Sequence, residues 1–429
     1  MESLRFLMVT TFYPPYHIGG DAVHVRYLAK ALAEQGHEVH VEFAPSAYRL
    51  KGGRGPLPAL DEDGITVHPI PSRLGRLQPI GAYLSGGSRS VSRTHAELMS
   101  RLRPDVVHLH NISLLGFGVL RSRSATTLYT AHDYWVRCPR SDLFKYGRYP
   151  CDAPTCLRCT LVSGKPPQLW RYREGWRGLR GVDLVIAPSR FMMQALEGYL
   201  NCPIVHIPNF APDPNPGGRA WEPSDYYLYA GVYETHKGVL ELAEAAGKNP
   251  TPWSVVLAGR GTLGNRLKRF EARADGRVKV HEWLAPDELA RLYRNARAFV
   301  MPSLSWENSP LGAIEALSWG APLLVSRRGG LEELLHEGAG GRSFNPGVAG
   351  LLSAFRQFEE DGLPSALRRS ARLAYEVHHR PQSYLKRYMD ACNGLARSRD
   401  RVAHPQAAAQ GGNQAKPDGV ERTIAHPSD

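Results

Sequence analysis

The chain has 429 residues, of which 42% are hydrophobic and 22% charged. This length predicts two or three domains, and the composition excludes disordered and collagen-like proteins. No apolar run reaches the roughly 20 residues of a membrane-spanning helix, and Glu2 and Arg5 interrupt the N-terminus where a signal peptide would be apolar. We therefore expect a cytoplasmic protein.

The formal net charge of +12 favours anionic partners, either phosphorylated small molecules or an anionic membrane surface at the inner face of the membrane. Basic residues are frequent over 49–103, but they are scattered and do not alternate with aromatic residues as on a nucleic-acid surface. We expect no nucleic-acid partner. A peripheral membrane contact and an ordinary solvated face both remain open.

Short apolar strands alternate with helical patterns in the first half of the chain. After the first strand comes a loop with two adjacent glycines, then a helix and a second strand. This alternation predicts a parallel sheet covered by helices on both faces. The strands are predicted at 4–10, 39–43, 65–70, 106–110, 126–130, 184–187 and 204–207.

A proline-rich stretch then interrupts this pattern, and we predict an interdomain linker at 209–223. Strands resume at 226–230, 255–258, 278–281, 298–301 and 322–325. The fold class is therefore α/β with two doubly wound domains. Ligands of such sheets bind at the carboxyl ends of the strands, so the site is expected in a central cleft between the domains.

The predicted domain limits are 1–208 for the N-terminal domain and 224–378 for the C-terminal domain. Pro381 ends one helical pattern and begins another, and we expect a C-terminal helix over 379–399 that crosses back to the N-terminal domain. The last segment, 400–429, lacks periodic apolar residues and is predicted to be disordered.

The strongest local motif runs from Glu307 to Glu315. Ser309 suits a helix N-cap and Pro310 a first helical residue, so a helix should begin just after the strand that ends near 301. Free backbone amides at its start would suit a diphosphate, and the two carboxylates would suit sugar and ribose hydroxyls. A capped surface helix with two solvated acids is the alternative. The amides in question belong to Asn308, Ser309, Leu311 and Gly312.

The order of several motifs resembles that of the retaining nucleotide-sugar glycosyltransferases of family four, in glycosyltransferase group 1. The Glu307 to Glu315 spacing matches the paired-glutamate signature of that family, and the resemblance covers about 4–395. The other matching motifs lie at 12–15, 19–20, 36–39, 104–108, 131–133, 188–189, 208–209 and 237–238. The resemblance implies a GT-B fold with two Rossmann-like domains, and it implies catalysis that requires no metal or other cofactor.

The resemblance also implies roles for individual residues. Glu307 would contact the donor sugar, Glu315 the ribose and Lys237 the phosphates. His132 would lie beside the reacting sugar and the acceptor.

Gly19 and Gly20 open the N-terminal helix, where the lack of a Cβ lets backbone approach a phosphate or acceptor. One residue departs from the family, because Val232 stands where a phosphate-binding arginine is usual. Arg260 or His236 would have to supply the missing contact.

Four of the six cysteines, which are Cys138, Cys151, Cys156 and Cys159, fall within 22 residues. The last two have the spacing of a zinc knuckle, so one structural zinc ion is our main hypothesis. Disulfides and four unligated thiols are the alternatives. One branch of the family has a similar cysteine-bearing loop after its active-site histidine, and we expect this loop to act as an acceptor-side lid.

The sequence thus predicts a glycosyltransferase that uses a nucleotide-diphosphate sugar as donor. Its acceptor would be a glycan or a lipid-linked molecule, in the synthesis of polysaccharide, glycolipid or another glycoconjugate. Two alternatives are a nucleotide-sugar epimerase of related fold and a non-catalytic sugar-nucleotide-binding protein.

Overall fold

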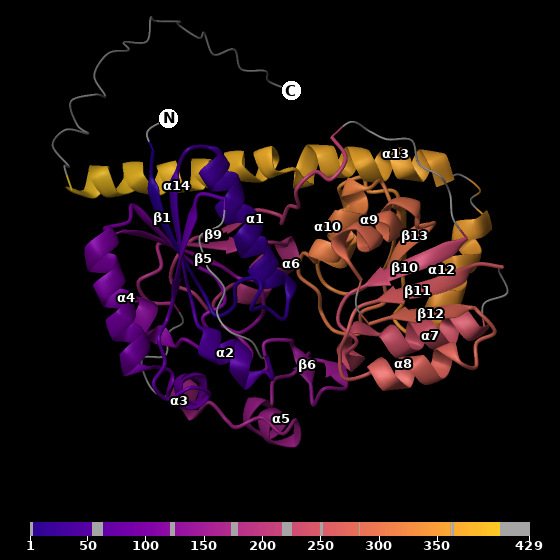
Figure 1. Cartoon of the computed structure of the whole chain (residues 1–429), viewed down its shortest axis with the longest axis horizontal. Coiled ribbons are helices and arrows are strands. Elements are labelled where there is room, and N and C mark those ends of the chain that lie inside the picture. Colours follow the sequence, from indigo (N-terminus) through magenta and orange to yellow (C-terminus); the bar gives the residue numbers. More distant parts are fainter. Residues whose placement is uncertain are drawn as a thin grey trace, which may run out of the picture.

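The structure is a computed structural model. It describes residues 3–53, 63–120, 125–172, 179–216, 225–248, 252–282, 284–360, 362 and 364–403. Two parallel sheets, each with helices on both faces, form its two halves (Figure 1). Within the described ranges, no helix has both the length and the apolar character needed to cross a membrane.

The first sheet has the strand order β3-β2-β1-β4-β5-β8-β9, and all its strands are parallel. The middle strands are buried because helices cover both faces, which explains their nearly continuous apolar sequences. The strands are β1 Arg5–Thr10, β2 Glu38–Phe43, β3 Ile65–Pro69, β4 Val106–Leu109, β5 Thr126–Thr130, β8 Leu184–Ala187 and β9 Ile204–His206. The helices are α1 Gly20–Glu34, α2 Pro45–Leu50, α3 Leu77–Ser85, α4 Arg89–Leu102, α5 Cys156–Val162 and α6 Arg190–Leu196.

The second sheet has the order β12-β11-β10-β13-β14-β15 and is also parallel. Its strands are β10 Tyr226–Ala230, β11 Ser254–Ala258, β12 Val278–His281, β13 Ala298–Met301, β14 Leu323–Ser326 and β15 Gly341–Phe344. Its helices are α7 Val239–Lys248, α8 Gly264–Glu271, α9 Pro286–Asn295, α10 Leu311–Ser318, α11 Leu331–His336 and α12 Val348–Glu360.

Every strand predicted from an apolar run is present, with ends that differ by one residue at most. The sequence did not predict β15, because its residues are glycine, arginine and serine before a single phenylalanine. It also did not predict the short hairpin of β6 Phe144–Lys145 and β7 Tyr149–Pro150. Both strands of this hairpin are only two residues long, too short for a periodic pattern.

Helix α13 Pro364–Ala374 and a π-helical turn at Tyr375–His379 lead into α14 Pro381–Ala403. Helix α14 runs along one edge of the first half of the molecule (Figure 1). Its side chains, among them Tyr384 and Tyr388, belong to the buried core that lies against the first sheet. The chain thus returns from the second sheet to the first. The helix continues to Ala403, so the prediction of a disordered segment is wrong for 400–403, and residues 404–429 lie outside the described residues.

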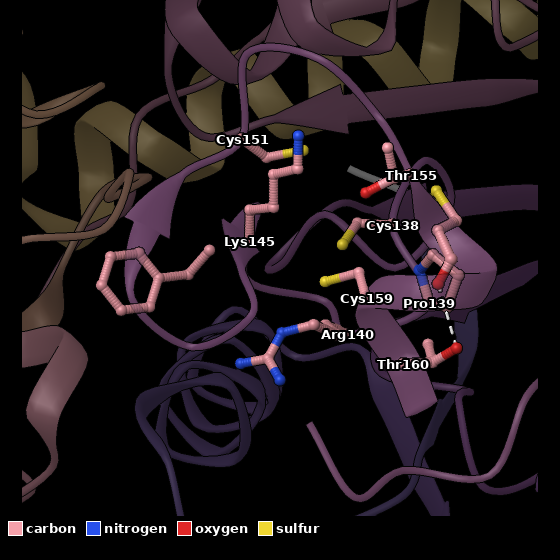
Figure 2. Close-up of a pocket in the computed structure, with 10 residues that line it drawn as sticks. Cys138, Pro139, Arg140, Lys145, Cys151, Thr155, Cys159 and Thr160 are labelled. Carbon is pink, nitrogen blue, oxygen red and sulfur yellow. Dashed lines mark hydrogen bonds between the residues drawn. The ribbon is translucent and has the colours of Figure 1, made fainter. Parts of the chain in front are cut away.

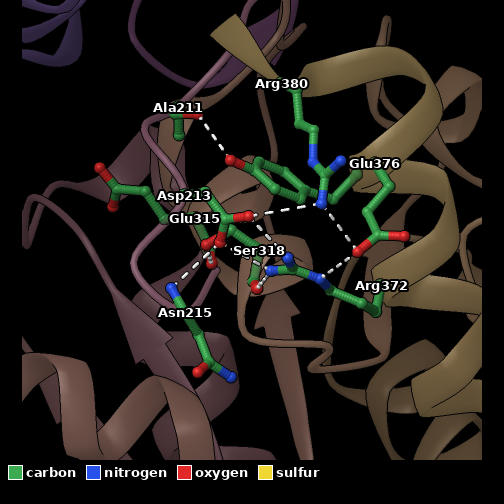
Figure 3. A network of polar contacts seen from close by, with 9 residues as sticks. Ala211, Asp213, Asn215, Glu315, Ser318, Arg372, Glu376 and Arg380 are labelled. Atoms are coloured by element: carbon green, nitrogen blue, oxygen red, sulfur yellow. Dashed lines mark hydrogen bonds and ion pairs between the residues drawn. The ribbon is translucent and has the colours of Figure 1, made fainter. Parts of the chain in front are cut away.

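The described part of the predicted linker is held in place by the second half of the molecule. Asp213 forms an ion pair of 2.6 Å with Arg372 of α13, and the Tyr375 hydroxyl donates to the Ala211 carbonyl at 2.9 Å (Figure 3). Arg372 also pairs with Glu376 at 2.9 Å. These contacts attach the linker to the second half of the molecule at Ala211 and Asp213, and residues 217–223 lie outside the described residues.

Candidate functional site

Helix α10 begins at Leu311, one residue later than the sequence predicted. Pro310 has extended backbone angles, and no side chain caps the helix, so the prediction that Ser309 is the N-cap is wrong. Ser309 instead pairs with Asn209. The Asn209 side-chain amide donates to the Ser309 carbonyl at 2.7 Å, and its backbone N–H donates to the Ser309 hydroxyl at 3.3 Å. This contact between distant segments uses the hydroxyl that a local cap would have needed.

Glu307 lies in the loop before α10 and pairs with Lys237. The Lys237 ammonium lies 2.7 Å from Glu307 Oε1, and the Ser303 hydroxyl donates to the same oxygen at 2.5 Å. Glu307 is buried, with 7% of its surface exposed. Burial by itself raises its pKa, but Lys237 and Ser303 together hold that pKa below its ordinary value. The carboxylate is therefore charged and fixed in place.

The turn that carries Lys237 packs directly against this loop. Gly238 follows Lys237 with a positive φ of 67°, and a Cβ there would lie 2.0 Å from the Pro302 carbonyl oxygen. Only glycine allows this conformation and this close approach. The position of the Lys237 ammonium therefore depends on Gly238.

Residues of the first domain hold the Glu307 loop from the other side. The Asn308 side-chain amide donates to the Ala131 carbonyl at 2.8 Å and accepts a hydrogen bond of 2.7 Å from the Ser189 hydroxyl. The Tyr134 hydroxyl donates to the Glu307 carbonyl at 3.2 Å. Segments after β5 and β8 therefore contact the segment after β13, and the carboxyl ends of the two sheets meet here.

Glu315 is held by two tyrosines from different domains. The Tyr27 hydroxyl of α1 donates to one carboxylate oxygen at 3.0 Å, and the Tyr293 hydroxyl of α9 donates to the other at 3.2 Å. Burial raises the pKa of Glu315, and the two hydrogen bonds partly oppose that rise. No local pattern pointed to Tyr27, because its partner is 288 residues away.

The N-termini of α1 and α10 lie next to each other. Helix α1 begins at Gly20 with Gly19 as its N-cap, as predicted, and no side chain caps it. A Cβ at Gly20 would lie 3.6 Å from the Leu311 side chain, and a Cβ at Gly312 would lie 3.3 Å from the Ala230 carbonyl oxygen. Two sets of backbone N–H groups, one from each domain, therefore lie at the same interface.

His132 follows β5 and belongs to a cluster of histidines. Its Nε2 lies 2.9 Å from Nδ1 of His110. His108 contacts the Thr130 hydroxyl at 2.8 Å and the Tyr388 hydroxyl of α14 at 3.1 Å. Burial is the main cause that lowers the pKa of His132 to about 4 and that of His108 to about 3. These rings are therefore neutral near pH 7.

Sequence reasoning did not single out His108 and His110, although their spacing is informative. His108 lies in β4 and His110 directly follows that strand. Residues two apart in extended backbone point to the same face of a sheet, and the two imidazole ring centroids lie 4.0 Å apart. His24 of α1 completes the cluster, with its ring centroid 5.0 Å from that of His132.

The structure distinguishes between His236 and Arg260, the two residues that could replace the arginine absent at position 232. Burial, followed by the charge of Lys237, lowers the pKa of His236, so this side chain is neutral near pH 7 and supplies no cation. Arg260 is exposed, and its charge contributes to the lowered pKa of His17 in the loop before Gly19. Arg260 therefore lies near the first domain and is the better candidate.

The four clustered cysteines line one pocket, together with Arg140 and Lys145 (Figure 2). All four are free thiols, and the backbone N–H of Tyr146 donates to Cys159 Sγ at 3.1 Å. Among the residues that the structure describes, no group of three or more His, Cys, Asp or Glu side chains is arranged to hold a metal ion. The structure thus gathers the thiols without forming a disulfide, and zinc binding stays a prediction. The cysteines are Cys138, Cys151, Cys156 and Cys159.

Two family models match successive parts of the chain. Glycosyltransferase Family 4 matches residues 18–212, and Glycosyl transferases group 1 matches residues 218–375. The chain belongs to the group 1 glycosyltransferases. This membership makes the protein a glycosyltransferase and favours glycosyl transfer over the epimerase and non-catalytic alternatives.

Known proteins resemble this glycosyltransferase along most of its length. A glycogen synthase of Mycobacterium tuberculosis is 29% identical over 399 residues, which is 86% of this chain and 89% of the relative. A sucrose-phosphate synthase of Thermosynechococcus elongatus has a TM-score of 0.68 at 17% identity, covering 92% of this chain and all of that structure. Anabaena HepE in complex with UDP and glucose has a TM-score of 0.64 at 17% identity, covering 91% of this chain and 100% of that chain. These structures establish the GT-B fold.

Proposed function

We propose that this glycosyltransferase moves a sugar from a nucleotide-diphosphate sugar to an acceptor hydroxyl with retention of anomeric configuration. The observation that carries the proposal is the pairing of Lys237 with Glu307 next to the N-terminus of α10. A cation and free backbone amides suit a diphosphate, and a fixed carboxylate suits sugar hydroxyls. HepE, whose structure contains UDP and glucose, supports a donor of this class.

Lys237, the amides of α10 and Arg260 would neutralise the leaving diphosphate, so the proposed reaction requires no metal ion. Glu315 would take the ribose, with ribose hydroxyls replacing the tyrosine hydroxyls that its carboxylate now accepts. Since Tyr27 belongs to the other domain, donor binding would be linked to the contact between the domains.

In the proposed reaction the bond from the anomeric carbon to the phosphate oxygen breaks, and a bond from that carbon to the acceptor oxygen forms on the same face. The acceptor proton goes to the leaving phosphate oxygen. His132 is neutral, so it would orient a hydroxyl through a hydrogen bond, with His110 fixing the ring.

The cysteine pocket would hold a single structural zinc ion. The thiols come from three parts of the segment after His132, and the hydrogen bond from Tyr146 to Cys159 suits a thiolate sulfur. Lys145 supplies positive charge beside the pocket, whereas Arg140 is paired with Asp142 at 2.8 Å. The ion would order the acceptor-side segment and take no part in the reaction.

Melting temperatures measured with a panel of sugar nucleotides would identify the donor, because a ligand that binds the folded state raises Tm. NMR of the product made with that donor and a glycan or lipid-linked acceptor would give the anomeric configuration. Inversion, or an absence of transfer from every donor, would contradict the proposal.

A further inference from the structure

Exposed apolar side chains of the first domain gather on α3, on α5 and on the short turn at Leu169–Tyr172. Leu77 is 64% exposed, Leu161 58% and Val162 62%. Single exposed apolar residues are ordinary, but a contiguous group marks an interaction site. We call this group the α3–α5 surface, and it consists of Leu74, Leu77, Leu84, Leu157, Leu161, Val162, Leu169 and Tyr172.

The turn at Leu169–Tyr172 links α3 and α5. The indole N–H of Trp170 donates to the Tyr83 carbonyl of α3 at 2.9 Å, which joins the turn to α3. The turn also lies beside α5, because the Cys156 thiol contributes to the raised pKa of Tyr172. Figure 1 shows α3 and α5 at the same end of the first domain, on the edge opposite α14.

Helix α5 exposes large apolar side chains that an ordinary surface helix would bury. Cys159 and Thr160 are buried, whereas Leu157, Leu161 and Val162 point to solvent. Surface helices of globular proteins normally bury their apolar side. The outward apolar side of α5 is therefore available to a partner outside the chain.

The two chain segments that carry this surface contain basic residues and no acidic ones. Residues 71–90 and 153–172 contain no Asp or Glu, and Arg73, Arg76 and Arg158 are exposed. Apolar side chains with flanking cations match the boundary between headgroups and acyl chains of an anionic bilayer. A second copy of the chain, which carries a net charge of +12, would bring the same basic surface and repel it.

We propose that the α3–α5 surface docks on an anionic lipid bilayer. The inference rests on the proposed function, because docking would present a membrane-held acceptor to the site. Helix α5 and the turn belong to the segment that begins after His132, and Tyr134 of this segment contacts the Glu307 carbonyl. Bilayer and active site would thus be connected by one stretch of chain.

The test is cosedimentation of the full chain with vesicles of phosphatidylcholine alone and with vesicles that also contain phosphatidylglycerol. We expect binding at least about tenfold stronger to the anionic vesicles, weakening as salt is added. The double variant Leu161→Glu/Val162→Glu should lose about tenfold or more of this binding. Its matched control, Leu373→Glu/Val377→Glu, changes two apolar residues that are also exposed but lie near the junction of α13 and α14, and it should bind like the wild type.

Equal binding to both vesicles, no binding, or equal loss in the control variant would overturn the inference. A dimer that forms without lipid and is abolished by Leu161→Glu/Val162→Glu would instead assign the surface to a second copy. Glu307→Gln should bind vesicles normally. If the protein turns over a donor but does not bind vesicles, only this inference is wrong. If it binds vesicles normally but turns over no donor, the proposed function is wrong.

Discussion

The ammonium of Lys237 lies 2.7 Å from the carboxylate of Glu307, although the two residues are 70 positions apart in the chain. Each neutralises the other in a site where Glu307 is buried and Lys237 is partly exposed. Neither side chain is a free surface charge. Their loss will therefore affect both chemistry and stability, to different extents.

Glu307→Gln keeps the shape and a hydrogen-bond acceptor but removes the charge. We expect kcat/KM to fall by at least about 100-fold while Tm changes by less than about 4 °C.

Lys237→Met should lose activity similarly and also lower the free energy of unfolding by up to about 3 kcal/mol, because it leaves a buried carboxylate without its cation. Steady-state kinetics and urea unfolding measure both effects. Glu244→Gln, in the exposed pair with Lys248, is the control and should change neither; near-normal turnover of Glu307→Gln would show that the donor site lies elsewhere.

Arg260→Ala should raise the donor Kd by about tenfold, the expected loss for a charge-assisted contact to phosphate. Adding Val232→Arg to this variant should restore affinity, because it returns a cation to the usual position. Calorimetric titration with the donor measures both. His236→Gln should leave Kd almost unchanged, since the neutral ring supplies no charge. An unchanged Kd in Arg260→Ala would show that Arg260 does not replace the phosphate-binding arginine that is missing at position 232.

Gly238→Ala should destabilise the fold by about 1 to 3 kcal/mol and reduce activity, because its Cβ would meet the Pro302 carbonyl at a positive φ. Lys237 would move with the turn, so the donor Kd should rise as well. Gly247→Ala is the matched control. It lies within α7 with open space around it, and alanine there should stabilise the fold by about 0.5 to 1 kcal/mol. Equal effects of the two changes would refute the role given to the turn.

The buried histidines predict a loss of stability in mild acid. The unfolded chain protonates histidine near pH 6.5, whereas the folded chain keeps His108 and His132 neutral down to about 3 and about 4. The unfolded state therefore binds more protons below pH 6.5, and the free energy of unfolding falls by roughly 1 kcal/mol per ring per pH unit. Urea unfolding across this range should show the slope.

His108→Gln should reduce that slope, because glutamine keeps polar contacts with Thr130 and Tyr388 without titrating. The exposed His336→Gln is its control and should leave the slope unchanged. A pH dependence that is identical in both variants would mean that other groups cause it.

The zinc proposal predicts about one zinc ion per chain in protein purified without a metal-affinity tag. Cys156→Ser/Cys159→Ser should lose the ion and become protease-sensitive over about 134–165, while both sheets stay folded. Cobalt in place of zinc would give thiolate charge-transfer bands in the wild type alone. Cys202→Ser is the control. If the purified protein contains no metal and its 134–165 segment resists protease, the zinc proposal is wrong and the cysteines are unligated thiols.

The buried strands were predictable because a short continuous apolar run bounded by turn residues is typical of a strand buried on both faces. Strand β15 was not predicted, because Gly341, Arg342 and Ser343 form no such run. The start of α1 at Gly20 was also predictable from local residues. The start of α10 was not, because the choice between a cap at Ser309 and a pairing with Asn209 depends on a segment 100 residues away.

The two-sheet architecture, the glutamate pair and the four grouped cysteines could be predicted from the sequence, because each depends on local periodicity or spacing. Which of these groups are charged, and which residues hold them, became clear only from the folded structure. His236 and His132 are neutral because of burial, and Glu307 is charged because Lys237 reaches it. Burial and charge pairing arise between segments far apart in the chain, so no local pattern encodes them.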